Sequence, residues 1–293
     1  MDDKSKVLIA SIEEAIKSLA QETDLKRQSS LFVSYLDMMG KFHNYSFYNE
    51  LLIAIQKPGA TNVAGFKTWQ TKFERSVKKG EKGIAILAPV LVKKNYQSST
   101  KKDKDAEVVS SDTLADNLLS TKCVGFRTAY VFDVSQTEGK PLPEEPNWHD
   151  TEKDLVIEAA LKAFADSKGI RVVEAEKLRG ADGLSCGGLI KVLPKAGTRT
   201  LVHELAHELL HWKHPELKLS REIEEIEADS TAYVVAQYFH LKQDSEASPN
   251  YLALFETSRE DILARFTRIR AVSKEIIEAV ESRKGLPDLE GAK

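Results

Sequence analysis

A histidine pair in the second half of the chain has the residue types and the spacing of a metal site. His203 and His207 are four positions apart in the run His-Glu-Leu-Ala-His, inside an apolar pattern at helical spacing. This spacing places both imidazoles on one helix face, one turn apart, where they can bind the same ion. Glu204 projects to the same side and is expected to take a proton from water activated by the ion. The motif predicts metal-assisted hydrolysis, with His203 and His207 as ligands and Glu204 as the catalytic base.

A third protein ligand is expected on the next helix, because catalytic zinc keeps three protein ligands and one open position. Glu225 and Asp229 lie one turn apart there. Glu225 is predicted to complete the metal shell, and Asp229 to accept the outer N–H of a ligating histidine and so fix its tautomer. Glu222 lies on a similar face and stays an alternative, whereas Glu224 and Glu227 are rotated from Glu225 by about 100° and 200°. The predicted ion is Zn²⁺, with Mn²⁺ or Co²⁺ as substitutes.

Other side chains near this motif are given simpler roles. A third histidine one turn further along cannot join the same tetrahedral site, so His211 and His214 are expected to be packing or surface residues. Glu208, like Glu224 and Glu227, is expected to be solvated. Tyr233 is the candidate for stabilising the oxyanion formed during hydrolysis. Residues 187–193 are expected to form an edge strand that holds an extended peptide.

The first half of the chain is basic. Residues 57–104 hold twelve lysines and arginines against three acids, a net charge of +9, so the rest of the chain carries −12 within the total of −3. Basic side chains neutralise phosphates and aromatic faces stack on unpaired bases, so this mixture favours single-stranded nucleic acid. Phe47, Phe66 and Trp69 would equally suit a hydrophobic core. The predicted nucleic-acid-binding residues are Lys67, Trp69, Lys72, Arg75, Lys78, Lys79 and Lys82.

The elements that must position these side chains follow from hydrophobic periodicity, which indicates an α+β fold for both halves. We predict a first domain over residues 1–140 with a polar insert at about 97–121, a proline-rich linker over 141–150 and a second domain over 151–293. Helices are expected at about 5–21, 27–40, 46–57, 65–75, 151–167, 199–213, 220–240 and 252–283, and strands at 84–92, 124–134, 170–174 and 187–193.

Length and composition exclude several classes of protein. A chain of 293 residues with 42% hydrophobic and 30% charged residues is typical of a globular protein with one large or two ordinary domains. Two cysteines, Cys123 and Cys186, exclude a disulfide framework and favour a reducing cytoplasm. No apolar run reaches the roughly 18–20 residues that span a bilayer, and the N-terminal pattern is not that of a signal peptide. We therefore expect a cytoplasmic protein with no membrane partner.

Taken together, these motifs resemble the ArdC-type antirestriction family over roughly residues 25–240. In the first half the likeness is carried by residues 45–53, 60–69, 77–83 and 130–139. The second half, with its HExxH motif and the Glu225/Asp229 pair, is similar to the zincin-like, gluzincin-type metallopeptidase domain of that family.

The resemblance implies an N-terminal domain that binds single-stranded DNA without sequence specificity. It also implies carriage on plasmids or other mobile elements and protection of incoming DNA from host restriction during conjugation. A zinc metallopeptidase domain implies a protein or peptide substrate, which the sequence does not identify. Two other interpretations stay open. One is a regulatory metalloprotease like ImmA/IrrE that cleaves a repressor, and the other is a non-catalytic protein that coats single-stranded DNA and holds a structural zinc ion.

Overall fold

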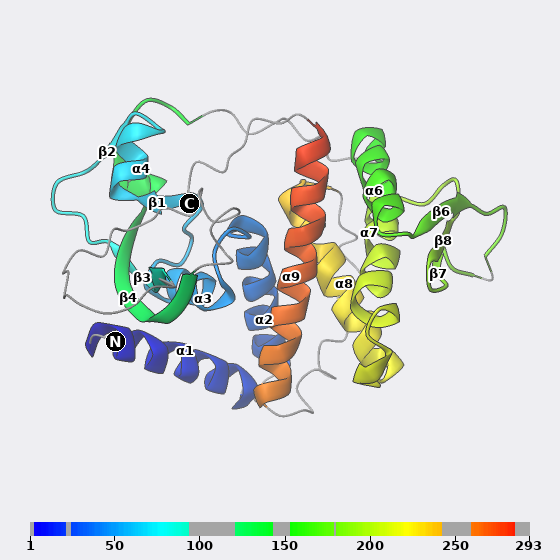
Figure 1. Cartoon of the computed structure of the whole chain (residues 1–293), viewed down its shortest axis with the longest axis horizontal. Coiled ribbons are helices and arrows are strands. Elements are labelled where there is room, and N and C mark those ends of the chain that lie inside the picture. The colour runs from blue at the N-terminus through cyan, green and yellow to red at the C-terminus, as the bar shows by residue number, and fades with distance from the viewer. Residues whose placement is uncertain are drawn as a thin grey trace, which may run out of the picture. The chain divides into compact units, whose positions relative to one another are not determined.

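The structure, a computed structural model, describes residues 3–21, 25–93, 121–142, 153–178, 180–241 and 259–284 (Figure 1). By its internal contacts the chain divides into two units. The first comprises residues 1–14, 48–142 and 289–293, and the second comprises 15–47 and 143–288. Both contain helices and strands, which confirms the predicted mixed α and β structure. Residues 15–47 lie within the first domain predicted over residues 1–140, but they group with the second unit. The predicted linker from residue 143 on, and the polar insert up to residue 120, lie outside the described residues.

The first unit is built around a long antiparallel hairpin. Strand β3 (Ile84–Lys93) pairs with β4 (Thr121–Asp133), and β1 (Val63–Gly65) pairs with the other side of β4, giving the strand order β1-β4-β3. A second sheet consists of β2 (Arg75–Val77) and β5 (Thr137–Gly139). The helices are α3 (Phe47–Gln56), α4 (Phe66–Thr71) and the part of α1 (Asp3–Gln21) that ends at residue 14.

Side-chain amides from α3 satisfy the outer edge of this sheet. Asn49 donates to the carbonyl of Leu87 at 3.0 Å and accepts from its N–H at 2.9 Å. Gln56 makes the same pair of hydrogen bonds with Ala85, at 2.8 and 2.9 Å. Because β3 is an edge strand, its outward backbone groups would otherwise have no ladder partner. The amides therefore fix α3 against the sheet.

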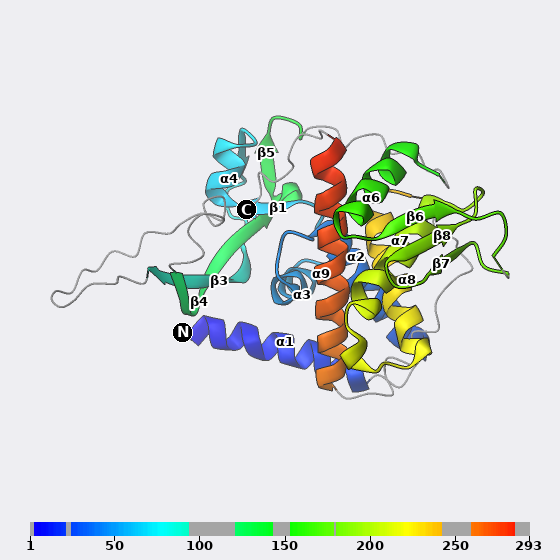
Figure 2. The same cartoon turned by 45° about the vertical axis from the view of Figure 1, so that its right-hand side comes forward.

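The second unit is mainly helical, with a small sheet beside α7 (Figure 2). In that sheet β6 (Arg171–Glu174) runs parallel to β8 (Leu189–Val192), and β7 (Gly183–Ser185) pairs antiparallel with the other side of β8. The helical elements are α2 (Leu25–Lys41), α6 (Leu155–Ser167), α7 (Thr198–His207), the π-helix η3 (Glu208–Trp212), the 3₁₀ turn η4 (Pro215–Leu217), α8 (Arg221–Tyr238) and α9 (Arg259–Lys284).

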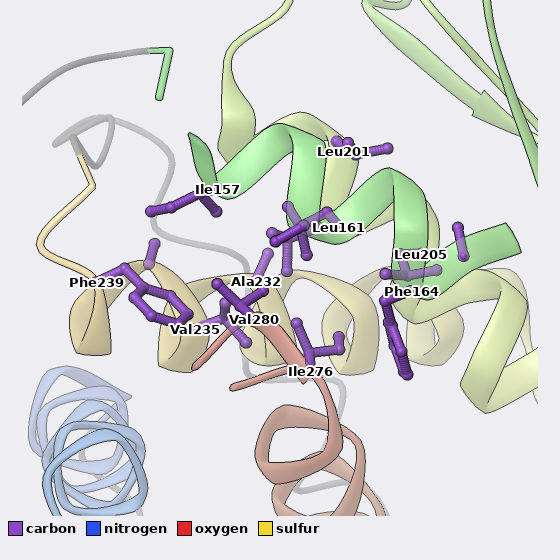
Figure 3. Close-up of a cluster of buried hydrophobic side chains, with 14 of the residues drawn as sticks. Ile157, Leu161, Phe164, Leu201, Leu205, Ala232, Val235, Phe239, Ile276 and Val280 are labelled. Atoms are coloured by element: carbon purple, nitrogen blue, oxygen red, sulfur yellow. The ribbon is translucent and has the colours of Figure 1, made fainter. Parts of the chain in front are cut away.

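The hydrophobic core of this unit lies where α6, α7, α8 and α9 meet (Figure 3). Leu161 of α6, Leu205 of α7, Val235 of α8 and Ile276 of α9 are each fully buried. Burying an aliphatic side chain of this size contributes about 1.5–3 kcal/mol. The core therefore holds α7 and α8 at a set distance, which the metal motif requires. Among the described helices, none is long and apolar enough to cross a membrane.

Three predicted elements need correction. The helix expected to reach residue 75 ends at Thr71, because the backbone turns at Glu74 with a φ of 53° and β2 begins at Arg75. The helix expected over 199–213 is α-helical only to His207 and continues as a π-helix. The strand expected at the edge of its sheet, residues 187–193, contains β8, which is the central strand; the edge strand next to α7 is β7.

Candidate metal centre

Three predicted ligand atoms come together between α7 and α8. The Nε2 atoms of His203 and His207 are 3.1 Å apart. Oε2 of Glu225 lies 3.4 Å from the first and 3.5 Å from the second. Among the described residues, these three side chains form a group able to hold a metal ion. Glu222, the alternative ligand, does not belong to this group.

The triangle has the dimensions of a tetrahedral metal site. Bonds of about 2.0–2.1 Å from a zinc ion to nitrogen and oxygen, at tetrahedral angles, separate two ligand atoms by about 3.3–3.4 Å. The three separations of 3.1, 3.4 and 3.5 Å lie close to that value. The donor set of two imidazoles and one carboxylate is also one that catalytic zinc uses. The residues present therefore fit the ion predicted from the sequence.

The protonation of two ligands suits metal binding. Burial, followed by the charge on His203, lowers the pKa of His207 to about 4, so its imidazole is neutral at pH 7. A hydrogen bond from His203 is the largest cause that lowers the pKa of Glu225 to about 2, against the opposing effect of its partial burial. A metal ion needs a neutral imidazole and an ionised carboxylate. Both groups are already in these forms.

Glu204 lies beside the ligands in a confined position. Its side chain is 8% exposed, and burial raises the pKa of its carboxyl group. A Cβ atom built at Gly183 would stand 2.7 Å from both Cγ and Oε1 of Glu204. Only glycine therefore leaves room for Glu204 beneath the edge strand β7. A carboxylate with a raised pKa is suited to accept a proton and return it.

Asp229 is placed differently from its prediction. It forms an ion pair with Arg199 of α7. Its Oδ1 is 3.9 Å from Nδ1 of His203, which is longer than a hydrogen bond. Asp229 thus lies next to the predicted partner, with its main contact to a guanidinium that also lines the cleft.

A cleft of about 850 Å³ opens over the ligands. One wall is β7, and Leu184 on that strand and Trp212 at the end of the π-helix are 45% and 54% exposed. Tyr233, the predicted oxyanion group, does not line this cleft. Its hydroxyl donates to Asp37 of α2 at 2.8 Å, and burial with that contact raises the pKa of Tyr233. Its role is therefore to join α8 to α2, and the prediction was wrong.

Two glutamates expected to be solvated are buried parts of the site. Glu208, 2% exposed, accepts hydrogen bonds from Ser185 Oγ and from the backbone N–H groups of Cys186, Gly187 and Gly188. It therefore anchors the turn between β7 and β8. Glu227, fully buried, contacts Nε2 of His211 at 3.2 Å. Only the π-helix and the packing of α8 reveal these roles, since charged residues on helices are usually solvated.

The remaining histidines also divide by environment. His214 is exposed and pairs with Glu216 at 3.1 Å, as a surface residue should. His211 is 8% exposed, and its Nδ1 lies 3.1 Å from Nδ1 of His207. It is not a member of the ligand group, as predicted. It contacts a ligand, however, which simple packing does not describe.

In the first unit the predicted nucleic-acid-binding residues do not share one role. Trp69 is 1% exposed and its Nε1–H donates to the carbonyl of Phe132, so its ring belongs to the core and cannot stack on a base. Arg75 donates to Thr137 and to the carbonyls of Gly139 and Lys140, which ties its guanidinium to β5 and the residue that follows it. Exposed side chains are those of Lys67, Lys72, Lys78, Lys79 and Lys82.

Exposed aromatic rings in this unit include Phe66, to which the sequence pointed, and Phe126 and Tyr130, to which it did not. Phe66 is 47% exposed and precedes Lys67 in α4. On β4, Phe126 and Tyr130 are 41% and 46% exposed. They are four positions apart, and side chains separated by an even number of positions lie on the same face of a strand. Large hydrophobic side chains alternate with other residues along 124–130, and this alternation could have indicated an exposed aromatic face. A strand prediction, however, places alternating hydrophobic residues in a core.

Comparison with known proteins connects the N-terminal part of the chain to one family. Residues 4–132 match the family model described as the N-terminal domain of anti-restriction factor ArdC. A Bacillus anthracis protein named as uncharacterized, pXO2-81, is 27% identical over 255 residues, which cover 77% of this chain. The match covers 43% of that relative, so the chain spans less than half of its length.

Two solved structures also resemble the chain. They are the metal-free and Mn(II)-bound crystal structures of the antirestriction ArdC protein from plasmid R388. Each is 16% identical to this chain, with TM-scores of 0.46 and 0.47. The first match covers 83% of this chain and 86% of the other, and the second covers 93% and 97%. Likeness at this level does not assign roles to individual residues.

Proposed function

We propose, from the premise that residues 4–132 match the N-terminal domain of anti-restriction factor ArdC, which confirms the predicted resemblance, that the protein is an antirestriction factor of a mobile element. In this proposal it binds single-stranded DNA through the first unit and carries a zincin-like zinc metallopeptidase in the second. The observation that supports the peptidase is the ligand triangle of His203, His207 and Glu225 with Glu204 beside it.

The residues of this site divide the work of hydrolysis. His203, His207 and Glu225 would hold a zinc ion, which polarises a carbonyl and acidifies water. Glu204 would accept a proton from the attacking water and return it to the leaving nitrogen, a role that its raised pKa favours. The backbone of β7, the edge strand of its sheet, is available to hold an extended peptide along the cleft.

A structural zinc ion is less consistent with this geometry. Structural sites surround zinc with four protein ligands, whereas catalytic sites keep one position open. The group found among the described residues has three ligands and faces a cleft. These features favour hydrolysis over a non-catalytic role.

Replacing Glu204 tests the enzyme directly. Glu204→Gln should bind zinc with wild-type stoichiometry and lose cleavage of an unstructured protein such as casein. His214→Gln is a matched control, since His214 is an exposed residue outside the ligand group. Antirestriction is then measured as plasmid transfer into restricting and non-restricting hosts. Wild-type protection by the zinc-bound Glu204→Gln variant would remove hydrolysis from the mechanism and favour DNA coating.

The proposed DNA surface consists of exposed side chains in the first unit. We define the basic surface as Lys67, Lys72, Lys79, Lys82 and the ring of Phe66, all exposed. Phe66 takes the stacking role that the sequence analysis gave to Trp69. Each Lys→Glu change should weaken binding to an oligonucleotide and reduce the salt slope by about 0.7 per lost phosphate contact. An unchanged slope in the Lys67, Lys79 and Lys82 variants, compared with Lys213→Glu in the second unit, would place the DNA elsewhere.

A further inference from the structure

A continuous row of hydrogen-bonding groups extends from the back of one metal ligand to α9. Nδ1 of His207 lies 3.1 Å from Nδ1 of His211. Nε2 of His211 lies 3.2 Å from Oε2 of Glu227, and the other carboxylate oxygen accepts from Arg268. The side chains of His211 and Glu227 are 6% and 0% exposed. Water therefore has little access to these contacts, and each group depends on its protein partner.

The terminal groups of the row indicate where the hydrogens lie. The carboxylate of Glu227 already accepts from Arg268, so Nε2 of His211 is placed to donate its hydrogen to Oε2. In that tautomer Nδ1 of His211 carries the lone pair. Because the facing atom is Nδ1 of His207, that atom must donate its hydrogen. His207 consequently keeps its lone pair on Nε2, the atom that faces His203 and Glu225.

The geometry of α8 explains how two of its glutamates contact opposite ends of one row of histidines. Glu225 and Glu227 are two positions apart in α8, which turns their side chains by about 200°. Glu225 reaches the front of the row at His203 and His207, and Glu227 reaches its far end at His211. His211 lies in the π-helical turn, a local widening that is frequent at functional sites.

We propose that His211 and Glu227 are positioning residues that hold His207 in the tautomer whose Nε2 lone pair faces the metal, with Arg268 orienting the carboxylate. This inference rests on the proposed metal site. His211 thereby has the role that was predicted for Asp229, which is to accept the outer N–H of a ligating histidine. Asp229 is 3.9 Å from Nδ1 of His203 and is paired with Arg199, so His207 is the ligand with a hydrogen-bonded outer partner.

The tautomers can be observed in the metal-free full-length protein by long-range ¹H–¹⁵N correlation of the histidine rings. We expect His207 in the Nδ1–H form and His211 in the Nε2–H form at pH 7. Finding His207 in the Nε2–H form would overturn the proposal. Because this measurement needs neither a substitution nor a metal, it decides the proposal even if zinc fails to bind, a result that would instead reject the proposed function.

Substitutions at His211 then test the consequence for the metal. His211→Leu removes the acceptor and should weaken zinc binding about 10- to 100-fold in a chelator competition. His211→Asn places an oxygen near the position of Nδ1 and should restore most of that affinity. His214→Asn, at the exposed histidine, should bind as wild type does. Melting of the metal-free variants controls for folding, and wild-type zinc affinity in a folded His211→Leu would also overturn the proposal.

The cobalt spectrum separates positioning from general stability. With Co²⁺ bound, the visible absorption of His211→Leu should shift relative to wild type, because the orientation of His207 changes the ligand field. His211→Asn should return the spectrum toward that of wild type. Identical spectra for wild type and His211→Leu would contradict a positioning role.

Discussion

The ligand face of α7 and α8 and the basic surface of the first unit hold their polar groups in different ways. Around the proposed metal ligands three glutamates are buried: Glu204, Glu208 and Glu227 are 8%, 2% and 0% exposed. Each has a partner that fixes its orientation or a wall that confines it. On the basic surface the lysines are exposed. A buried site depends on each of its members, whereas exposed charges contribute in small and interchangeable amounts.

The largest effect expected in this comparison concerns Trp69, which lies inside the unit that carries the basic surface. Trp69→Ala should lower the free energy of unfolding by about 3–5 kcal/mol, because it empties a fully buried site and removes a hydrogen-bond donor. Denaturant unfolding measures this loss. A stable Trp69→Ala variant with reduced DNA affinity would return Trp69 to the binding surface.

The next prediction concerns His207, one of the proposed metal ligands. The pKa of His207 is about 4 in the folded protein and near its ordinary value of 6.5 when unfolded. Below pH 6.5 the unfolded state therefore binds more protons, so the folded state loses stability as the pH falls from 6.5 to 4. Over that window the metal-free protein should lose up to about 3 kcal/mol of unfolding free energy from this group. Unfolding at several pH values, with His207→Phe as the comparison, measures the difference; equal slopes in both proteins would contradict it.

A smaller effect is expected where β7 passes over Glu204, the proposed catalytic base. Gly183→Ala would place a methyl group 2.7 Å from Glu204, which must move. We expect peptide cleavage to fall about 100-fold, the usual consequence of displacing a catalytic group by about 1 Å, while zinc binding is retained. Gly125→Ala is the matched control, because a Cβ there meets nothing within 4 Å. Full activity of the Gly183→Ala variant would mean that Glu204 does not need this position.

The smallest effect should come from the basic surface. Phe66→Ala should leave thermal stability close to wild type and weaken binding of an oligonucleotide by about 1–3 kcal/mol, the contribution of one stacked base. Titration by fluorescence anisotropy at constant salt measures it. If Phe66→Ala binds normally but Phe126→Ala does not, the stacking surface lies on β4.

The sequence predicted the arrangement of side chains on the ligand face of α7 and α8 more accurately than that on the basic surface, and the reason is physical. The HExxH spacing predicted which side chains of α7 lie together, because a helix fixes which side chains share a face within one turn. Composition predicted the basic surface less well. The same lysines, arginines and aromatics occur whether a side chain faces water, as Lys79 does, or is tied to the backbone, as Arg75 is.

Other errors came from contacts between elements distant in sequence. Tyr233 was predicted from its face of α8, but Asp37, nearly two hundred residues away, holds its hydroxyl. Residues 187–193 were predicted as an edge strand. The strand that they contain, β8, is central instead, because β6 pairs with one side of it and β7 with the other. The periodicity of the local sequence predicts neither the Tyr233–Asp37 hydrogen bond nor the strand order, because both depend on which distant segments meet after folding.

The sequence by itself determined the chemistry available to this protein: two histidines and a glutamate within one helical turn, and a carboxylate on the next helix. Their types and spacing follow from covalent order and the geometry of the α-helix. Only the tertiary structure decided which carboxylate lies with His203 and His207, that Gly183 confines Glu204, and that His211 and Glu227 lie behind His207. These depend on burial and on the packing of α8 against α7 and α9, which brings together groups that the sequence keeps apart.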